Sequence, residues 1–337
     1  MRDGRDNAPG AGPLRRLWIG ITLALAAQLA AASSAGDQDP SWWLERMPVA
    51  ARTLNYDGVF VYRHAGGMET IRVIHRVVDG NEQERLTSLD GDRREVLRGP
   101  DRVTCIWSGN KSVLVDESRR RGLLGSALFQ ADDRLRQQYR LEMGGQARIA
   151  GRAARELRVA PVDEFRYGYR LWLDVGSALL LKAQLLDEKA AVLEELLFTR
   201  IELPEEIPDN VLEPEVASEG FDRHTTAGPA APAPAPKTAP PHWAVGWVPP
   251  GFHETGYSRE PLAGGQTPVD HLVFSDGLAA FSVYVERVTG DRKPFEGLSQ
   301  MGALTAYGKR LGEFQVTVVG DVPRVTVDRV GRSVQRR

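Results

Sequence analysis

The segment LNYDGVFVYRHAGG, residues 54–67, reads as a β-strand with apolar side chains on both faces. Side chains alternate along a strand, so Phe60 and Tyr62 point to one side. Val59 and Val61 point to the other side. A strand with one wet face should carry polar residues on that face, and this segment has almost none in its first half. We therefore expect that another part of the protein, or a ligand, covers the second face.

The segments that follow predict an antiparallel meander. In METIRVIHRVVDG, residues 68–80, one face of the expected strand carries Ile71, Val73, His75 and Val77, and an Asp-Gly-Asn turn follows. Further strand candidates are residues 84–91, 93–107, 110–117, 146–151, 154–161, 167–177, 179–188 and 191–203. About nine or ten strands are too many for one small flat sheet, so a strongly curved sheet or a partly closed barrel wrapped over helices is expected.

Two segments of this region predict helical structure. Residues 39–54 begin with Asp39 or Ser41 as a cap and repeat apolar residues at helical spacing, although Pro48 is expected to interrupt or end the first turns. Residues 118–143 are expected to form a helical or irregular insertion with an apolar patch beside charges. This insertion is a candidate cover for the opening strand.

The N-terminus has the pattern of an export signal. Arg15 and Arg16 precede an apolar run of 15 residues, and small residues suited to cleavage follow near Ala35. The run is shorter than the about 20 residues of a membrane span, which favours cleavage over a retained anchor. The Arg pair lacks further twin-arginine context. The sequence therefore predicts a signal peptide at residues 1–35 and general secretion.

Charge and cysteine content restrict the class of protein. Removing residues 1–35, which carry four Arg and two Asp, changes the formal net charge from −2 to −4, and this near-balance argues against a polyanion-binding protein. The single cysteine, Cys105, cannot form an internal disulfide. Its place in VTCIW predicts a small, buried hydrophobic residue on a strand rather than a catalytic thiol.

A Pro/Ala segment divides the chain into two domains. TTAGPAAPAPAPKTAPP, residues 225–241, has no apolar period, and alternating Ala-Pro favours an extended, semi-rigid spacer. The sequence therefore predicts a large domain at residues 40–222, a linker at 223–241, a small α+β domain at 242–330 and a frayed tail at 331–337.

The small domain is expected to combine strands with one helix. Residues 269–288 predict a hairpin, because a Ser-Asp-Gly turn joins two apolar runs. Residues 295–313 predict a helix, because apolar side chains recur near helical spacing at Leu298, Met301, Leu304 and Leu311. Residues 314–330 return to the alternation of a strand.

No catalytic or metal-binding spacing is found in the sequence. The six His residues form no HExxH pair, one Cys excludes a CxxC site, and no GxSxG occurs. The basic runs at 93–94 and 119–121 are either solvated edges or docking points for acidic groups such as phosphates. These observations favour a binding protein without cofactors over an enzyme such as a periplasmic hydrolase.

Several stretches, taken in order, resemble the periplasmic sigma-E regulators of the RseB/MucB family. They are residues 42–77, 84–98, 201–216, 242–254, 268–286 and 301–323. The resemblance runs from Trp42 to Val330 and so covers nearly the whole mature chain.

This resemblance implies a fold and a function. The family's large domain is similar to the lipoprotein carriers LolA and LolB, a half-open antiparallel β-barrel with helices in its mouth. Its small domain docks on the periplasmic part of a membrane-spanning anti-sigma factor, RseA or MucA, and shields it from a DegS-type protease. Lipid parts of lipopolysaccharide are the implied signal for release. The alternative is a lipid or lipoprotein carrier, although a carrier needs only the barrel. A homo-oligomer is compatible with either function.

Two sets of candidate binding residues follow. The expected lipid site comprises Phe60, Tyr62, Ile74, Leu128 and Phe129, with Arg119, Arg120 and Arg121 near head-group phosphates. The expected partner surface comprises residues near the linker, His242, Trp243, Trp247, Phe252 and Tyr257, because aromatic anchors are frequent hot spots. For both sets the alternative is an ordinary core. Which face of the opening strand lines the cavity stays open at this level.

Overall fold

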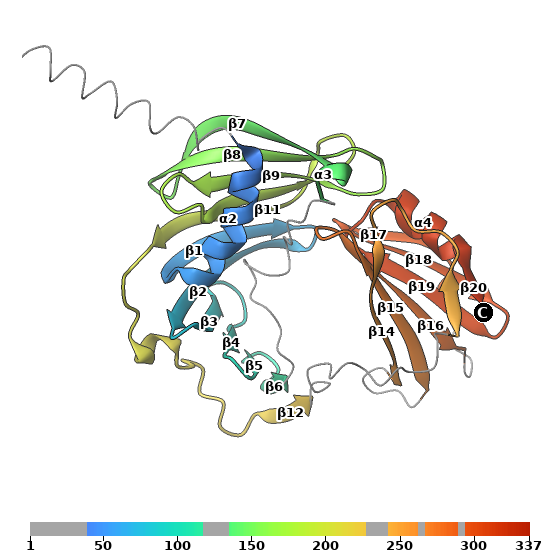
Figure 1. Ribbon diagram of the computed structural model, residues 1–337. Coiled ribbons are helices and arrows are strands. Elements are labelled where there is room, and N and C mark those ends of the chain that lie inside the picture. The colour runs from blue at the N-terminus through green and yellow to red at the C-terminus, as the bar shows by residue number, and fades with distance from the viewer. Residues whose placement is uncertain (1–38, 117–134, 227–241, 262–266, 289–293) are drawn as a thin grey trace, which may run out of the picture.

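The computed structural model describes residues 39–116, 135–226, 242–261, 267–288 and 294–337. The chain forms two lobes, a large domain coloured blue to yellow and a small domain coloured orange to red (Figure 1). A 12-stranded sheet builds the large domain, and a 6-stranded sheet, a helix and a 2-stranded sheet build the small one. The predicted fold class, mainly β with a large half-open sheet domain and a smaller α+β domain, is confirmed.

The large domain begins with a helix and continues as a meander. Its elements are α2 (Pro40–Thr53), β1 (Tyr56–His64), β2 (Gly67–Val78), β3 (Asn81–Ser88), β4 (Arg94–Arg98), β5 (Val103–Trp107), β6 (Ser112–Asp116), α3 (Leu135–Gln138), β7 (Tyr139–Ile149), β8 (Arg152–Pro161), β9 (Gly168–Asp174), β10 (Leu180–Leu186), β11 (Val192–Glu202), η2 (Asp209–Leu212) and β12 (Asp222–Thr226). The strand order is β12-β6-β5-β4-β3-β2-β1-β11-β10-β9-β8-β7. Since β12 and β7 do not pair with each other, the curved sheet stays open (Figure 1).

Helix α2 packs across the concave face of this sheet. Asp39 caps it by accepting a hydrogen bond from the Ser41 N–H at 2.9 Å, one of the two caps that the sequence indicated. Pro48 lies inside the helix and does not end it, contrary to the prediction. The reason is packing: Leu44 and Met47 are at most 1 % exposed, and their burial offsets the backbone hydrogen bond that proline removes.

A returning loop closes the convex side of the sheet. The Arg85 guanidinium, 3 % exposed, lies 3.0 Å from Glu95 and 2.9 Å from Glu215. Glu95 is fully buried and also accepts hydrogen bonds from the backbone N–H groups of Glu215 and Val216. Each buried charge therefore has partners, and the loop after η2 is held against β3 and β4.

The small domain has a separate core between its sheet and one helix. Its elements are β13 (Trp243–Val245), β14 (His253–Pro261), β15 (Pro268–Ser275), β16 (Ala280–Arg287), β17 (Gly297–Met301), β18 (Leu304–Leu311), β19 (Phe314–Gly320), α4 (Arg324–Ser333) and β20 (Val334–Arg336). The 6-stranded sheet has the order β14-β15-β16-β19-β18-β17, and β13 pairs with β20. The predicted hairpin around the Ser-Asp-Gly turn is confirmed as β15–β16.

The predicted helix at residues 295–313 is wrong. These residues form the β17–β18 hairpin, and Gly302 in its turn has a φ of 62°, which favours glycine. Leu298 and Met301 are 41 % and 65 % exposed. Their helical spacing therefore does not mark a buried helical face.

The prediction of strand through residues 314–330 is wrong in its second half. Strand β19 ends at Gly320, and α4 begins after Pro323. Val327 and Val330 are both fully buried, and their spacing of three places them on one face of a helix against the sheet. The alternation of valines with polar residues concealed this helical period.

Three further sequence expectations need correction. Residues 331–337 are not a frayed tail, because they complete α4 and form β20. The linker begins later than residue 223, since Asp222–Thr226 pairs with β6. Cys105 lies on β5 as expected, but it is half-buried rather than buried.

Candidate functional site

A cavity of about 850 Å³ lies between the concave face of the large sheet and the small domain. Apolar side chains from β1 to β5 and β9 to β11 form most of its wall: Phe60, Tyr62, Ile71, Leu86, Val96, Trp107, Tyr169, Leu171, Leu180, Ala183, Leu185 and Leu196. The small domain completes the wall with Leu278, Ala279, Ala280 and Asp321. A concave, mostly apolar space of this size is typical of a small-molecule site.

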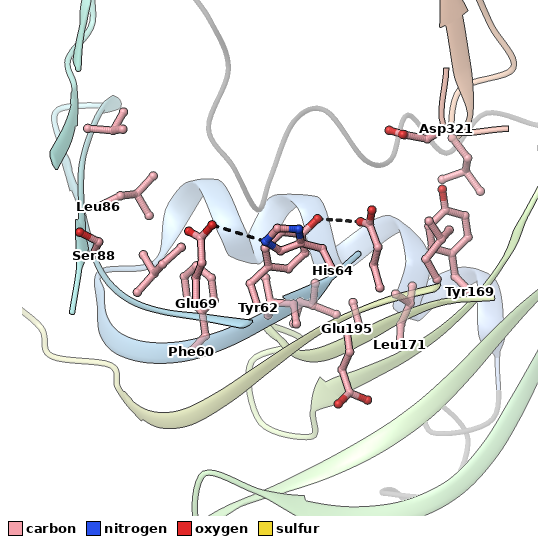
Figure 2. Close-up of a pocket in the computed structure, with 18 of the residues that line it drawn as sticks. Phe60, Tyr62, His64, Glu69, Leu86, Ser88, Tyr169, Leu171, Glu195 and Asp321 are labelled. Atoms are coloured by element: carbon pink, nitrogen blue, oxygen red, sulfur yellow. Dashed lines mark hydrogen bonds and ion pairs between the residues drawn. The ribbon is translucent and has the colours of Figure 1, made fainter. Parts of the chain in front are cut away.

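The pairing register of β1 with β2 decides which face of the opening strand lines the cavity. Phe60 pairs with Ile71, and these two side chains share a face. Tyr62 pairs with Glu69 on the same face, and all four side chains reach the cavity wall. The intervening valines project to the convex side. Figure 2 shows Phe60 and Tyr62 rising from β1 into the cavity.

Ile74 does not line the cavity, so its place in the predicted lipid site is wrong. It pairs with Asp57 on β1 and with Arg85 on β3, and cross-strand partners share a face. That face is the convex one, where Asp57 binds Arg72 at 2.8 Å. A shift of one residue along a strand reverses the side-chain direction, and an apolar residue among polar neighbours gave no sign of this.

Two acidic side chains lie at the cavity end where the domains meet. The Tyr62 hydroxyl donates a hydrogen bond to Glu194 at 2.7 Å, and Asp321 of the small domain lines the same cavity (Figure 2). Burial, and secondly the charge of Glu194, raise the pKa of Asp321. Burial and the bond to Glu194 also raise the pKa of the Tyr62 hydroxyl. The negatively charged forms of the Asp321 carboxyl and the Tyr62 hydroxyl are therefore disfavoured here. For the same reason, this end of the cavity is unfavourable for an anionic group of a ligand.

Another part of the cavity wall carries a mixed-charge cluster. Glu69 accepts a hydrogen bond from the Arg94 guanidinium at 2.5 Å and lies 3.4 Å from a ring nitrogen of His64. The Arg94 side chain is 41 % exposed, so this cluster reaches solvent. An apolar interior with a polar, solvent-accessible rim suits an amphipathic ligand.

A buried ion pair joins the two domains beside the cavity. Arg166 of the large domain lies 2.5 Å from Asp276 of the small domain, and both side chains are 0 % exposed. Arg166 also donates to the Pro250 carbonyl at 2.5 Å, and the Tyr139 hydroxyl donates to Asp276 at 3.1 Å. The Asp276 turn continues into Leu278, which lines the cavity. This joint therefore determines where the small domain closes the cavity.

The aromatic residues predicted to bind a partner lie at different depths. Trp243 and Phe252 are 3 % and 6 % exposed in the core of the small domain. Trp247 is half-buried at the joint, where its ring meets Phe165 of the large domain edge-on at 5.1 Å. Trp243 and Phe252 are therefore ordinary core residues, which was the alternative to partner binding. Trp247 connects the two domains.

The other two residues of that set lie nearer the surface. The Tyr257 hydroxyl donates a hydrogen bond to Asp270 at 2.6 Å. The His242 ring lies 3.9 Å from the same carboxylate, and its side chain is 47 % exposed. Partner binding by His242 and Tyr257 stays a prediction.

Part of the predicted sites lies outside the described residues. This holds for five residues of the lipid set, Leu128, Phe129, Arg119, Arg120 and Arg121. It also holds for the signal peptide at 1–35 and for linker residues 227–241.

Sequence reasoning missed the joint and the small-domain wall of the cavity. In the sequence, Asp276 is marked only as a turn residue, and no pattern marks Arg166 or Asp321. Arg166 and Asp276 are 110 positions apart, and no local period marks such a pair. The one signal in the sequence is that Arg166 comes just before the apolar strand β9, where a charged residue needs a partner if it is buried.

The described ranges contain neither a candidate metal-ion cluster nor a candidate membrane-spanning helix. No group of three or more His, Cys, Asp or Glu residues in these ranges could hold a metal ion. In the same ranges, no helix has the length and apolar character needed to cross a membrane.

Comparisons with known proteins match both domains. The model of the MucB/RseB N-terminal domain matches residues 39–216, and that of the MucB/RseB C-terminal domain matches residues 237–335. Sigma factor AlgU regulatory protein MucB of Pseudomonas aeruginosa is 36 % identical over 326 residues, 95 % of this chain and 96 % of the relative. Sigma-E factor regulatory protein RseB of Escherichia coli K12 is 26 % identical over 96 % of this chain and 98 % of the relative.

Two solved structures are similar over almost their whole length. The crystal structure of MucB in complex with MucA(peri) has a TM-score of 0.70 at 32 % identity, covering 89 % of this chain and 99 % of the other. The crystal structure of MucB has a TM-score of 0.60 at the same identity, covering 89 % and 98 %.

Proposed function

This chain belongs to the MucB/RseB family, and on that premise we propose that it is a periplasmic negative regulator of a sigma-E-type envelope-stress response. It acts by binding the periplasmic part of an RseA- or MucA-type anti-sigma factor, and it is not an enzyme. The regulatory names of its relatives and the complex of MucB with MucA(peri) support this proposal. Export through residues 1–35 would deliver the chain to the compartment where such a partner is exposed.

The proposed second ligand is a lipid, with the acyl chains of lipopolysaccharide as the favoured source. The cavity supports this, because its wall is mostly apolar and its volume is about 850 Å³. Each methylene that leaves water for such a wall contributes about 0.8 kcal/mol. The polar part of the ligand would contact Arg94 and Glu69 at the solvent-accessible rim.

The observation that carries the proposal is that both domains line one cavity. Leu278 and Asp321 of the small domain lie opposite residues of the large sheet. A ligand that fills the cavity therefore acts on the position of the small domain. If the anti-sigma factor binds only one domain arrangement, lipid and partner oppose each other by their differential affinity for the two arrangements.

In the proposed mechanism the bound regulator shields the anti-sigma factor from a DegS-type protease. Lipid shifts the domains toward an arrangement that binds the anti-sigma factor weakly, and release exposes the cleavage site. The bound regulator shields the cleavage site simply by covering it, so the mechanism requires no catalytic residue.

Calorimetry of the mature chain tests this function. MucA(peri), the segment found in the complex of the relative, is titrated alone and again after addition of an acylated lipopolysaccharide fragment. The matched control is the same fragment after removal of its acyl chains. We expect binding that weakens with the acylated fragment only. Absence of MucA(peri) binding, or equal binding with both fragments, would contradict the proposal.

A lipid carrier is the second candidate. The apolar cavity supports this function if the small domain is left out of consideration. A carrier should move a fluorescent lipid between donor and acceptor vesicles, whereas a sensor should bind the lipid without increasing transfer. The small domain weighs against a carrier, because it contributes a wall and a joint that a simple barrel does not need. Rapid transfer without MucA(peri) binding would favour the carrier.

A further inference from the structure

One of the two outer strands of the 6-stranded small-domain sheet, β17, lacks the features that usually protect a sheet edge. Strand β17, with the sequence GLSQM, has no charged residue and no proline, and all five of its residues are exposed. Among the described strands, none pairs with its outer side. Exposed edges of this kind are sites where another extended chain can add.

The other outer strands of the two large sheets carry the usual protection. Strand β14 has charged residues, Pro261 at its end and a register shift after Glu254. Strand β7 has charged residues and a register shift after Met143. Strand β12 begins with Asp222 and Arg223. Charges, prolines and bulges prevent unwanted strand addition, so their absence from β17 sets this edge apart.

The backbone of β17 is oriented for strand addition. A two-residue turn joins β17 to β18, so the closing pair Met301–Leu304 exchanges backbone hydrogen bonds. Hydrogen-bonded and non-hydrogen-bonded pairs alternate along an antiparallel ladder. Leu298 and Gln300 therefore belong to the second kind, and their N–H and C=O groups point away from β18, toward the open edge.

Exposed apolar side chains surround this edge and continue onto the large domain. Leu298, Met301 and Leu304 are 41 %, 65 % and 40 % exposed. The turn at Gly302 contacts Ala65 in the β1–β2 hairpin, because a Cβ built on Gly302 would lie 2.9 Å from the Ala65 side chain. Met68, 68 % exposed, follows in the same hairpin. Exposed apolar side chains thus lie on both sides of the boundary between the domains.

We propose that an extended, uncharged segment of the anti-sigma factor's periplasmic part adds to β17 as a seventh strand. This inference rests on the proposed function and names its docking surface. Main-chain hydrogen bonds to Leu298 and Gln300 give affinity, and apolar side chains of the segment pack on Met301 and Met68. The partner follows from the location. A chain that crosses from the small to the large domain senses their relative position, as opposition between lipid and partner requires.

A matched pair of variants tests the edge in the full mature chain. Gln300→Ala and Gln300→Pro both lose the side-chain bond from Gln300 to the Gly302 carbonyl, but only proline removes the outward N–H. Calorimetry with MucA(peri) should give at least about tenfold weaker binding for Gln300→Pro than for Gln300→Ala, because only the proline variant lacks the outward N–H. Equal binding by both variants overturns the inference.

A second variant and a second measurement keep the test valid if the proline variant does not fold. Met301→Lys places a charge on the exposed edge and should also weaken MucA(peri) binding about tenfold. In the unaltered chain, hydrogen exchange at the Leu298 and Gln300 amides should slow on MucA(peri) binding. Unchanged exchange with saturating MucA(peri) overturns the inference.

The outcomes separate the docking surface from the function itself. If the unaltered chain does not bind MucA(peri), the proposed function fails and this inference fails with it. If the unaltered chain binds and the variants bind equally well, only the docking surface is wrong. If light scattering shows that Gln300→Pro loses self-association and keeps MucA(peri) binding, the edge belongs to a second copy of the chain, and the inference is overturned.

Discussion

Arg166 of the large domain and Asp276 of the small domain form an ion pair at 2.5 Å with no exposed side-chain surface. The carboxylate is held on its other side by hydrogen bonds from the backbone N–H groups of Leu278 and Ala279, at 2.9 and 2.7 Å. The pair thus connects the joint to residues that line the cavity. Charges buried this deeply are costly without their partner, so the domain arrangement depends on both residues being present.

Removing one partner of this pair should destabilise the joint. We expect Arg166→Met to lower the free energy of unfolding by about 3–5 kcal/mol, because Asp276 stays buried without its cation. The double variant Arg166→Met/Asp276→Asn should recover part of this loss, since Asn keeps an acceptor for the turn. Chemical denaturation measures the stability, and small-angle scattering measures the separation of the domains.

The control for this prediction is an exposed pair of the same chemistry. Arg332 lies 2.9 Å from Asp328, and its side chain is 67 % exposed. Arg332→Met should change the stability by no more than about 0.5 kcal/mol. Equal effects of Arg166→Met and Arg332→Met would show that the buried pair does not hold the domains.

Filling the cavity should abolish lipid binding and leave the fold intact. Ala183 on β10 lines the cavity, and Ala183→Trp would occupy space that an acyl chain needs. We expect binding of a fluorescent acyl-chain probe to weaken by at least about tenfold. Thr199→Trp, on an exposed position of the neighbouring strand β11, is the control and should bind the probe normally. Unchanged probe binding by Ala183→Trp would place the lipid elsewhere.

The contribution of Asp321 to the free energy of unfolding should fall as pH rises. Burial and Glu194 raise the pKa of its carboxyl, so the folded state binds this proton more tightly than the unfolded state does. The stabilisation is complete below the unfolded pKa of about 3.9 and is lost as pH rises through the higher folded value. Asp321→Asn should therefore raise the melting temperature near neutral pH and flatten its pH dependence. Melting curves from pH 4 to pH 8 measure both effects, with the exposed Glu254→Gln as control. An equal pH profile in Asp321→Asn and the unaltered chain would contradict this account.

Gly58 in the opening strand should not tolerate a side chain. A Cβ at this position would lie 2.7 Å from the Phe198 ring and 3.0 Å from the Arg200 carbonyl. Gly58→Ala should therefore cost about 1–3 kcal/mol of stability, because Phe198 packs on Phe60 and cannot move freely. Gly145→Ala is the matched control, since nothing lies within 4 Å of its Cβ. Denaturation curves that coincide for the two variants would refute the steric explanation.

The sequence by itself determined the division into two domains and most strands of the meander. Strand alternation, Asp-Gly turns and a Pro/Ala segment are local signals, and each depends only on residues close in the chain. The same local signals misassigned residues 297–311, where apolar spacing occurs in exposed strands. They also misassigned residues 324–333, where an alternating pattern forms a helix because its valines bury against the sheet.

The sequence also indicated an apolar opening strand with two covered faces. It did not decide between Phe60 with Tyr62 and the intervening valines, and it placed Ile74 on the wrong side. Strand register makes this choice, because a shift of one residue reverses every side chain, and register depends on partners far away in the chain.

The tertiary structure alone assembled the cavity and its joint. Asp321 comes to the cavity that Tyr62 and Glu194 line, and Arg166 meets Asp276, only after both domains have folded and packed. Such contacts leave no local period in a sequence, because they are selected by shape and charge at the contact and not by spacing along the chain. The sequence thus determined most of the elements and indicated the family, and the packing of one domain on the other formed the cavity.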